Sequence, residues 1–200
     1  MKIALMGGIA CGKSLLSQFL NEFGVETLDA DDVVHEIIPD PAERRRIAAE
    51  VFADPAKRKE LEAKIHPIVK ERIEKFFDES GARDASYPSI RQSVNPSIKQ
   101  SKQSKQSNNL KIAIIPLLFE VHWEKNFDII SSVVSKREKQ IERMVTTRLM
   151  TRAEAEARLA AQLPVEEKAK RSHYVIHNDG SPEELKAKAK AFVDWLRAKL

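Results

Sequence analysis

The feature that most constrains this chain is a glycine-rich run near its start, Gly7-Gly8-Ile9-Ala10-Cys11-Gly12-Lys13-Ser14. It fits the pattern G-x-x-x-x-G-K-[ST] of a phosphate-binding loop. The apolar run 2–6 before it predicts a buried strand, and Leu16, Phe19, Leu20 and Phe23 after it recur at helical spacing. A strand, a glycine loop and a helix in this order aim backbone N–H groups at an anion. The pattern therefore predicts an α/β fold that binds the phosphates of a nucleotide.

Two side chains of this loop carry specific expectations. Lys13 is expected to reach the β- and γ-phosphates of ATP, and the Ser14 hydroxyl to ligate Mg²⁺ together with water. The neighbouring loop amides and Lys13 could lower the pKa of the Cys11 thiol, although a small residue that simply fits is the more ordinary interpretation. The residues expected to contact ATP are Gly8, Ile9, Ala10, Cys11, Gly12, Lys13, Ser14 and Leu15.

Composition limits the class of protein. The chain has 200 residues, 42% hydrophobic and 32% charged, which predicts one soluble globular domain without a membrane span. Met1 and Lys2 lead directly into an apolar strand, so no signal peptide is expected. A single cysteine excludes an intrachain disulfide and favours the cytoplasm. The net charge of +4 suits small polyanionic ligands, and because it is not gathered in one arm, nucleic acid is not predicted as a partner.

Strands and helices are predicted to alternate along the chain. Further strands are expected at 25–28, 111–115, 128–134 and 174–176, and helices at 42–51, 55–65, 67–77, 136–149, 151–163 and 182–200. The last two helices begin with capping boxes, Thr151 with Glu154 and Ser181 with Glu184. This alternation predicts a parallel sheet covered on both faces. Residues 86–109, rich in Ser, Gln, Lys and Asn, are predicted to form a mobile loop.

Acidic and basic side chains near the strand ends are the candidates for chemistry. Asp29 and Asp31 end the second strand, and alternate strand residues would point to the same side, toward the glycine loop. Either carboxylate could accept a hydroxyl proton or hold Mg²⁺ through water; alternatively, one caps the helix that follows. Glu120 follows the apolar run 116–119. From the basic helix, Arg143 and then Arg148 are the candidates for stabilising charge on a transferring phosphoryl group.

Taken in order, these motifs resemble those of the dephospho-coenzyme A kinase family. The resemblance rests on the glycine loop, on Asp29-Ala30-Asp31 and on Pro116-Leu117-Leu118-Phe119-Glu120. It also rests on shorter matches: Val51-Phe52-Ala53-Asp54, Leu61-Glu62, His66-Pro67, Gln140 with Arg143, Arg158 with Gln162, and Asn178. The chain is similar to the family over most of residues 1–80 and 110–190.

The resemblance implies a P-loop kinase fold, a five-stranded parallel sheet with helices on both faces. It implies a core of residues 1–34, 110–135 and 166–200, a helical acceptor region at about 35–109 and a lid at about 136–165. The implied reaction transfers phosphate from Mg²⁺-ATP to the ribose 3′-hydroxyl of dephospho-CoA, with Asp31 as the base. Lys13 and Arg143 would stabilise charge, Arg143, Arg148 and Asn178 would contact ATP, and the protein would be a monomer. The implied acceptor contacts are Asp31, Arg44, His66, Leu117 and Glu120.

The chain departs from the family in its acceptor region. His35 stands where the family usually has an arginine, and Ile37-Ile38-Pro39 runs almost directly into Glu43-Arg44, where the family has a longer segment. Two alternatives therefore stay open: a P-loop kinase for a nucleoside monophosphate or a sugar, and a nucleotide-binding relative without catalysis. A nucleic-acid-binding protein is the remaining alternative, supported only by net charge and the Lys/Gln/Ser-rich stretch.

Overall fold

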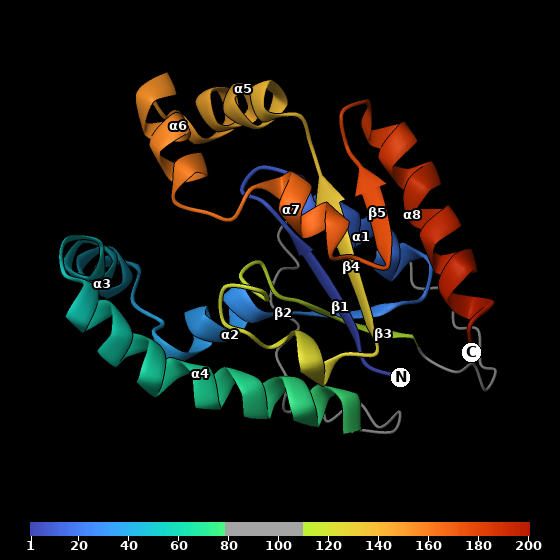
Figure 1. The fold of residues 1–200 in the computed structure, drawn as a ribbon, viewed down its shortest axis with the longest axis horizontal. Coiled ribbons are helices and arrows are strands. Elements are labelled where there is room, and N and C mark those ends of the chain that lie inside the picture. Colours follow the sequence, from blue (N-terminus) through green and yellow to red (C-terminus); the bar gives the residue numbers. More distant parts are fainter. Residues whose placement is uncertain (79–109) are drawn as a thin grey trace.

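Five parallel strands form the central sheet of the computed structural model, which describes residues 1–78 and 110–200 (Figure 1). Their order in the sheet is β2-β3-β1-β4-β5. In the register, Ala4 of the central strand β1 lies opposite Ala113 of β3 and Ile130 of β4. The strands are β1 (Ile3–Gly7), β2 (Glu26–Asp29), β3 (Lys111–Ile114), β4 (Ile129–Val134) and β5 (Tyr174–His177). The predicted fold class, a parallel α/β sheet, is confirmed.

Helices cover both faces of this sheet, and side-chain alternation along β1 decides which core each residue joins. Ile3 and Leu5 pack with α1 and α8, whereas Ala4 and Met6 pack with α2 and α4. The helices are α1 (Lys13–Glu22), α2 (Ala30–Ile37), α3 (Pro41–Ala53), α4 (Pro55–Asp78), α5 (Arg137–Arg148), α6 (Arg152–Ala160), α7 (Val165–Lys170) and α8 (Pro182–Arg197), with a short 3₁₀ helix at Glu124–Asn126. Within the described ranges, no helix is long and apolar enough to cross a membrane.

Helix α4 corrects one prediction. Two helices were expected, at 55–65 and 67–77, with a break before Pro67; the structure has one continuous helix with Pro67 inside it. Proline removes one backbone hydrogen bond and favours a break. Here Ile65, Val69 and Ile73 form a buried row at four-residue spacing against the sheet, and the burial of this row offsets the lost bond.

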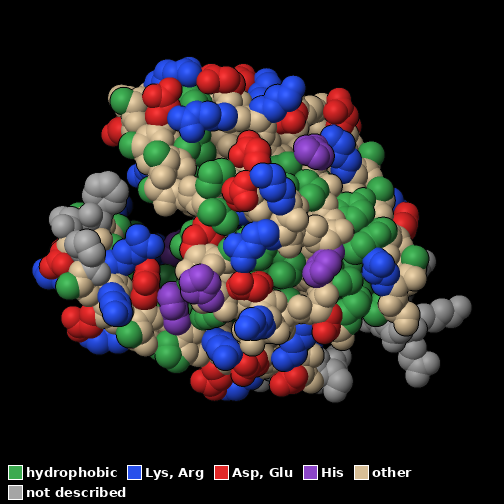
Figure 2. Space-filling model, viewed as in Figure 1, with side chains coloured by type: hydrophobic (Ala, Val, Ile, Leu, Met, Phe, Trp, Pro, Cys, Tyr) green, Lys and Arg blue, Asp and Glu red, His purple; other side chains and the backbone are tan. Residues whose placement is uncertain are grey.

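Two lobes stand beyond the carboxyl ends of the strands. Helices α5 and α6 project on one side and α3 with the start of α4 on the other, while the rest of α4 runs back along the sheet toward the amino ends of the strands (Figure 1). The space-filling surface is hollowed between the two lobes (Figure 2). The α5–α6 lobe has its own small core of Ile141, Met144 and Ala155. The predicted helix 151–163 ends earlier, at Ala160, and α7 follows as a separate helix that the sequence did not predict. The predicted mobile loop, 86–109, lies outside the described residues.

Candidate functional site: a phosphate loop and a cavity lined by Asp31

The carboxyl ends of the five strands meet at one edge of the sheet, where open α/β folds bind ligands. The segments that follow them are the glycine loop after β1, Asp29 at the end of β2, Pro116 after β3, Ser135 after β4 and Asn178 after β5. The sequence therefore brings five separate segments to one place.

The glycine loop has the tight backbone that phosphate binding requires. Gly12 has φ 91° and precedes α1, whose first turn has no side-chain cap, so its N–H groups stay open to an anion. A Cβ at Gly12 would lie 2.2 Å from the amide nitrogen of Asn178, and a Cβ at Gly8 would lie 2.6 Å from Val165. Ala10 also takes a left-handed conformation, with φ 58°. Neighbouring segments therefore press against the loop at positions that only glycine fits.

Lys13 folds back over this loop. Its ammonium donates to the carbonyls of Gly7 and Gly8, both at 3.0 Å. Burial lowers the pKa of Lys13, while the nearby acidic groups of Cys11, Asp31 and Asp29 act in the opposite direction. The charge of the Lys13 ammonium is thus close enough to the carboxylates of Asp29 and Asp31 to interact with them. The Ser14 hydroxyl, next in the chain, is on an exposed residue.

Cys11 is fully buried, and burial raises the pKa of its thiol, with Lys13 only partly offsetting the shift. The possibility that its setting lowers the pKa is therefore wrong, because desolvation outweighs the nearby positive charge. Its sulfur accepts a 3.1 Å hydrogen bond from Gln140. The simpler interpretation, a small residue that fits the loop, agrees with this packing.

Polar side chains from distant segments hold the loop backbone. Gln140 donates to the Ile9 carbonyl at 2.7 Å, and Gln162 accepts from the Ile9 N–H at 3.1 Å. Asn178 donates to the Cys11 carbonyl at 2.9 Å. The loop therefore keeps its shape through contacts with both ends of the α5–α6 lobe and with the end of β5.

The two predicted lid arginines lie in different settings. Arg143 donates to the Ala10 carbonyl at 3.2 Å, to the Ser135 hydroxyl at 2.9 Å and to the Asn178 carbonyl at 2.8 Å. Its charge is thus fixed beside the glycine loop. Arg148 is exposed at the end of α5 and forms no hydrogen bond or ion pair within the part of the chain that the structure describes.

The two aspartates after β2 do not lie on one strand, contrary to the prediction. The strand ends at Asp29, whose carboxylate accepts the Asp31 N–H at 2.9 Å and caps α2, so Asp31 lies in the first helical turn. The capping alternative is therefore the correct one for Asp29. Burial, with Asp31 and Asp32 close by, raises the pKa of Asp29 to about 6. Asp31 remains exposed.

A cavity of about 150 Å³ opens beside Asp31. One wall comes from α4, including His66, and the other from the loop after β3, including Leu117. Trp123 closes the loop side and meets His66 edge to face, with ring centroids 5.5 Å apart. Of the predicted acceptor residues, Asp31, His66 and Leu117 line this cavity. The sequence analysis did not single out Trp123, since a lone aromatic after an apolar run carries no motif.

The other two predicted acceptor residues do not line the cavity. Arg44 donates to the carbonyls of Ile38 and Pro39, at 2.5 and 2.9 Å, and so completes the end of α2. Glu120 pairs with the ammonium of Lys168 at 2.7 Å. Lys168 is completely buried, and the sequence analysis missed it because four of the six residues in 165–170 are charged, a composition typical of an exposed segment.

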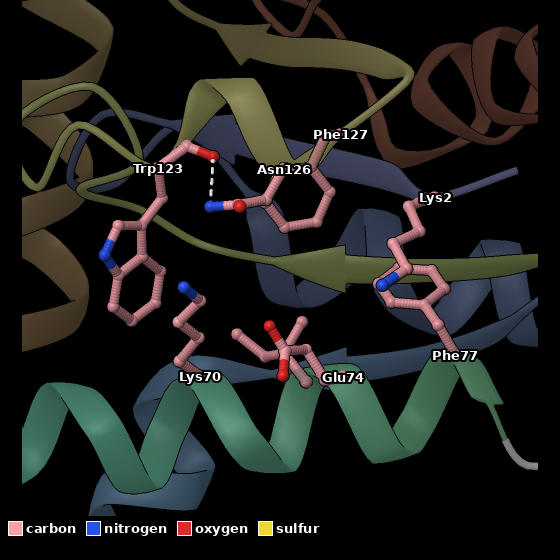
Figure 3. Close-up of a pocket in the computed structure, with 8 residues that line it drawn as sticks. Lys2, Lys70, Glu74, Phe77, Trp123, Asn126 and Phe127 are labelled. Atoms are coloured by element: carbon pink, nitrogen blue, oxygen red, sulfur yellow. Dashed lines mark hydrogen bonds between the residues drawn. The ribbon is translucent and has the colours of Figure 1, made fainter.

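A second cavity, of about 220 Å³, lies where β1 and β4 begin, at the sheet edge opposite the glycine loop (Figure 3). Lys70 points from α4 toward Trp123, and Phe77 and Phe127 line the cavity nearer the end of α4 (Figure 3). Trp123 lines both cavities. Since this cavity lies at the amino ends of the strands, it is separate from the phosphate site.

Comparison with known proteins decides the family. The family model described as dephospho-CoA kinase matches residues 1–44 and 82–184. The chain belongs to the dephospho-CoA kinase family. A dephospho-CoA kinase of Synechococcus sp. (strain JA-3-3Ab) is 36% identical to it, over 94% of this chain and 89% of the relative.

Solved structures agree with this membership. The crystal structure of TT1252 from Thermus thermophilus matches 98% of this chain and 97% of its own, with a TM-score of 0.73 and 28% identity. The dephospho-CoA kinase from Campylobacter jejuni matches at a TM-score of 0.55 and 19% identity, over 96% of this chain and 95% of its own, and so shares the fold. The resemblance inferred from the motifs is therefore confirmed.

The family model does not cover every part of the candidate site. The family model leaves residues 45–81 unmatched, which covers most of α3 and all of α4. The departure noted in the sequence after Ile37 leads into the same region. The wall that α4 contributes to the Asp31 cavity thus lies outside the residues that the family model matches.

Proposed function

We propose that this protein transfers the γ-phosphoryl group of ATP to the ribose 3′-hydroxyl of dephospho-CoA, giving ADP and CoA, the last step of coenzyme A biosynthesis. One observation carries the proposal: Asp31 lines a cavity and is also close enough to Lys13 of the phosphate loop for their charges to interact. A donor site on one side of a carboxylate and an acceptor cavity on the other is what in-line phosphoryl transfer requires.

Each residue has a defined part in this proposal. The loop amides and Lys13 bind the β- and γ-phosphates of ATP, with the loop held by Asn178. Asp31, exposed at the start of α2, accepts the proton of the attacking 3′-hydroxyl. Arg143, fixed against the Ala10 carbonyl, adds positive charge where negative charge develops in the transition state. Arg148, unpaired among the described residues, is available to ATP.

Magnesium fits the residues at the loop. The Ser14 hydroxyl is exposed and the carboxylates of Asp29 and Asp31 lie near Lys13, so the available donors are the hard oxygens that Mg²⁺ prefers. Ser14 and water would hold the ion. When bound, Mg²⁺ neutralises charge on the β- and γ-phosphate oxygens.

The division of the chain forms part of the proposal. We assign residues 1–34, 110–135 and 166–200 to the nucleotide core, about 35–109 to the acceptor side and about 136–165 to a lid. The α5–α6 lobe would close over ATP and exclude water. A cytoplasmic monomer without a nucleic-acid partner stays a prediction.

The test is ADP release with Mg²⁺-ATP and dephospho-CoA, run beside AMP, UMP and gluconate as rival acceptors. Release with dephospho-CoA alone is the expected result. Release only with another acceptor would instead support a different small-molecule kinase. If no acceptor gives ADP release in protein that still binds ATP, the result would support a nucleotide-binding relative without catalysis, the alternative that His35 and the shortened segment after Ile37 favour.

A further inference from the structure

Lys168 is the most unusual side chain that the proposed reaction does not use. It lies on α7, its exposed fraction is 0%, and its ammonium is 2.7 Å from Glu120 Oε1 and 2.8 Å from the Pro116 carbonyl. A lysine is almost never fully buried unless it is paired, because removing its charge from water is costly. Both of its partners belong to one short loop, residues 116–120, which follows β3.

This loop forms a wall of the proposed acceptor cavity. Pro116 and Leu117 line the cavity directly, beside Asp31. Glu120 Oε1 also accepts from the Leu163 N–H, at 3.4 Å, while Glu120 Oε2 is buried with no hydrogen-bond donor among the described residues. Lys168 therefore supplies the main compensation for the Glu120 charge and fixes both ends of residues 116–120.

The segment that carries Lys168 touches the nucleotide loop on its other side. Gln162 accepts from the Ile9 N–H, and Val165 lies against Gly8, so close that a Cβ there would clash. Five residues of chain, 163–167, separate the Gln162 contact with the glycine loop from the Lys168 contact with the acceptor loop. A short, well-packed helix transmits displacement between such contacts because it does not compress.

A second contact holds the same helix end to the same region. The Arg171 guanidinium lies 3.6 Å from the centroid of the Phe119 ring and pairs with Glu124 at 3.0 Å. Lys168 and Arg171 therefore both hold the 116–124 segment through side-chain contacts. Trp123, at the end of this segment, lines the Asp31 cavity and is placed to report any movement of the loop.

We propose that Lys168 is a positioning residue that, through Glu120 and the Pro116 carbonyl, couples the glycine loop to the 116–120 wall of the acceptor cavity. A nucleotide that moves the glycine loop shifts Gln162 and Val165, and Lys168 passes this shift to the acceptor wall. The proposal rests on the proposed function for the identity of the acceptor, but not for the coupling itself.

The first test needs no acceptor. The chain has two tryptophans, and Trp195→Phe leaves Trp123 as the sole reporter. We expect Mg²⁺ with a non-hydrolysable ATP analogue to change Trp123 emission in this parent. Lys168→Met should remove most of that change while the Kd of the analogue stays within about threefold. Lys170→Met, on the exposed side of α7 with Glu167 as its partner, is the matched control and should respond like the parent.

Two results would overturn the coupling. The first is a Trp195→Phe parent whose Trp123 emission does not change when the nucleotide is added. The second is a folded Lys168→Met variant whose Trp123 emission changes as much as that of the parent. If Lys168→Met alone does not fold, the Lys168→Met/Glu120→Gln double variant removes both charges and restores a neutral pair. It should also lose the response, since methionine has no donor that could link α7 to the Pro116 carbonyl. A folded double variant with a full response equally overturns the proposal.

The second test separates positioning from a merely structural role. With dephospho-CoA as the acceptor, Lys168→Met should raise the KM for dephospho-CoA about tenfold or more over that of the wild-type protein. The KM for ATP should stay within about threefold of the wild-type value. A role in stability alone would reduce the folded fraction without splitting the two KM values. Wild-type protein that does not phosphorylate dephospho-CoA would overturn the proposed function. The fluorescence experiment would still decide the role of Lys168, because it needs no acceptor.

Discussion

The side-chain amide of Asn178 donates a 2.9 Å hydrogen bond to the carbonyl of Cys11, 167 positions earlier in the chain. Asn178 is buried, with 6% of its surface exposed, and its own carbonyl accepts from Arg143. The end of β5 is thereby part of the nucleotide loop. The bond also explains why Gly12 has no room for a side chain.

Replacing Asn178 should therefore affect both stability and nucleotide use. Asn178→Ala leaves the Cys11 carbonyl without its donor, and a buried unsatisfied group costs about 1–3 kcal/mol in the free energy of unfolding. We expect a raised KM for ATP as well, because the loop loses a fixed point. Urea unfolding and steady-state kinetics measure the two effects. Asn21→Ala, which removes only surface bonds to Thr27, is the control, and equal behaviour of the two variants would contradict the assignment.

Asp31→Asn should lower kcat about 10²–10⁴-fold, the range for removal of a general base, and leave ATP affinity nearly unchanged. The amide keeps the size of the side chain but cannot accept the proton. ADP release gives kcat, and nucleotide titration gives the Kd. Asp32→Asn, one position along α2, is the matched control. Wild-type turnover in Asp31→Asn would show that another group takes the proton.

Lys13→Ala should weaken the use of ATP. The substitution removes the ammonium that now bonds to the Gly7 and Gly8 carbonyls, and with it a charge-assisted contact to phosphate. A loss of about 1.5–3 kcal/mol corresponds to roughly a 10–150-fold lower kcat/KM for ATP. Lys64→Ala, on an exposed part of α4, should match the wild type. A kcat/KM unchanged in Lys13→Ala would exclude this lysine from phosphate binding.

The stability of the protein should depend on pH through Asp29. Burial raises the pKa of this carboxyl from 3.8 to about 6, so the folded state binds its proton more tightly than the unfolded state does. The contribution to stability is complete below about pH 4 and is lost as the pH rises through about 6. Urea unfolding of the wild type minus that of Asp29→Asn, measured from pH 4 to 7, should therefore decline with pH.

The asparagine in that comparison keeps a capping oxygen for α2, so the difference isolates the titration of Asp29. Asp40→Asn, at the exposed cap of α3, is the matched control. A flat or rising difference for Asp29→Asn would mean that the carboxyl is ionised in the folded protein throughout this range.

Alkylation of Cys11 should be slow in the folded protein at neutral pH. The thiol is fully buried and its pKa is raised, so reaction requires the loop to open. Mg²⁺-ATP should slow the reaction further by holding the loop closed. Mass spectrometry after timed exposure to iodoacetamide, with and without nucleotide and in urea, measures these rates. Equal rates with and without nucleotide would contradict the protection by ATP.

The sequence predicted those parts of the fold that depend on local patterns. The glycine loop, the five strands and the caps at Thr151 and Ser181 follow from residue types a few positions apart. It failed where tertiary packing decides. The buried row on α4 carries that helix through Pro67, and the carboxylate of Asp29 starts a helix where the strand was expected to continue.

The candidate site shows the same limit. Asp31, His66 and Leu117 carry motif signals and line one cavity, but Arg44 carries a signal as well and caps α2 instead. Lys168 lies among Glu166, Glu167 and Lys170, and no spacing rule distinguishes a buried lysine from its exposed neighbours on so short a helix. Its burial depends on a loop some 50 residues earlier in the chain.

The order of strands has a consequence for synthesis on the ribosome. The first strand, β1, is central, and both of its neighbours, β3 and β4, come more than 100 residues later. Asn178 follows the last strand. The glycine loop therefore emerges well before the segments that support it, so a nascent chain should bind ATP only after β5 and Asn178 have been made. A chain truncated before β5 should accordingly fail to retain nucleotide, however complete its glycine motif.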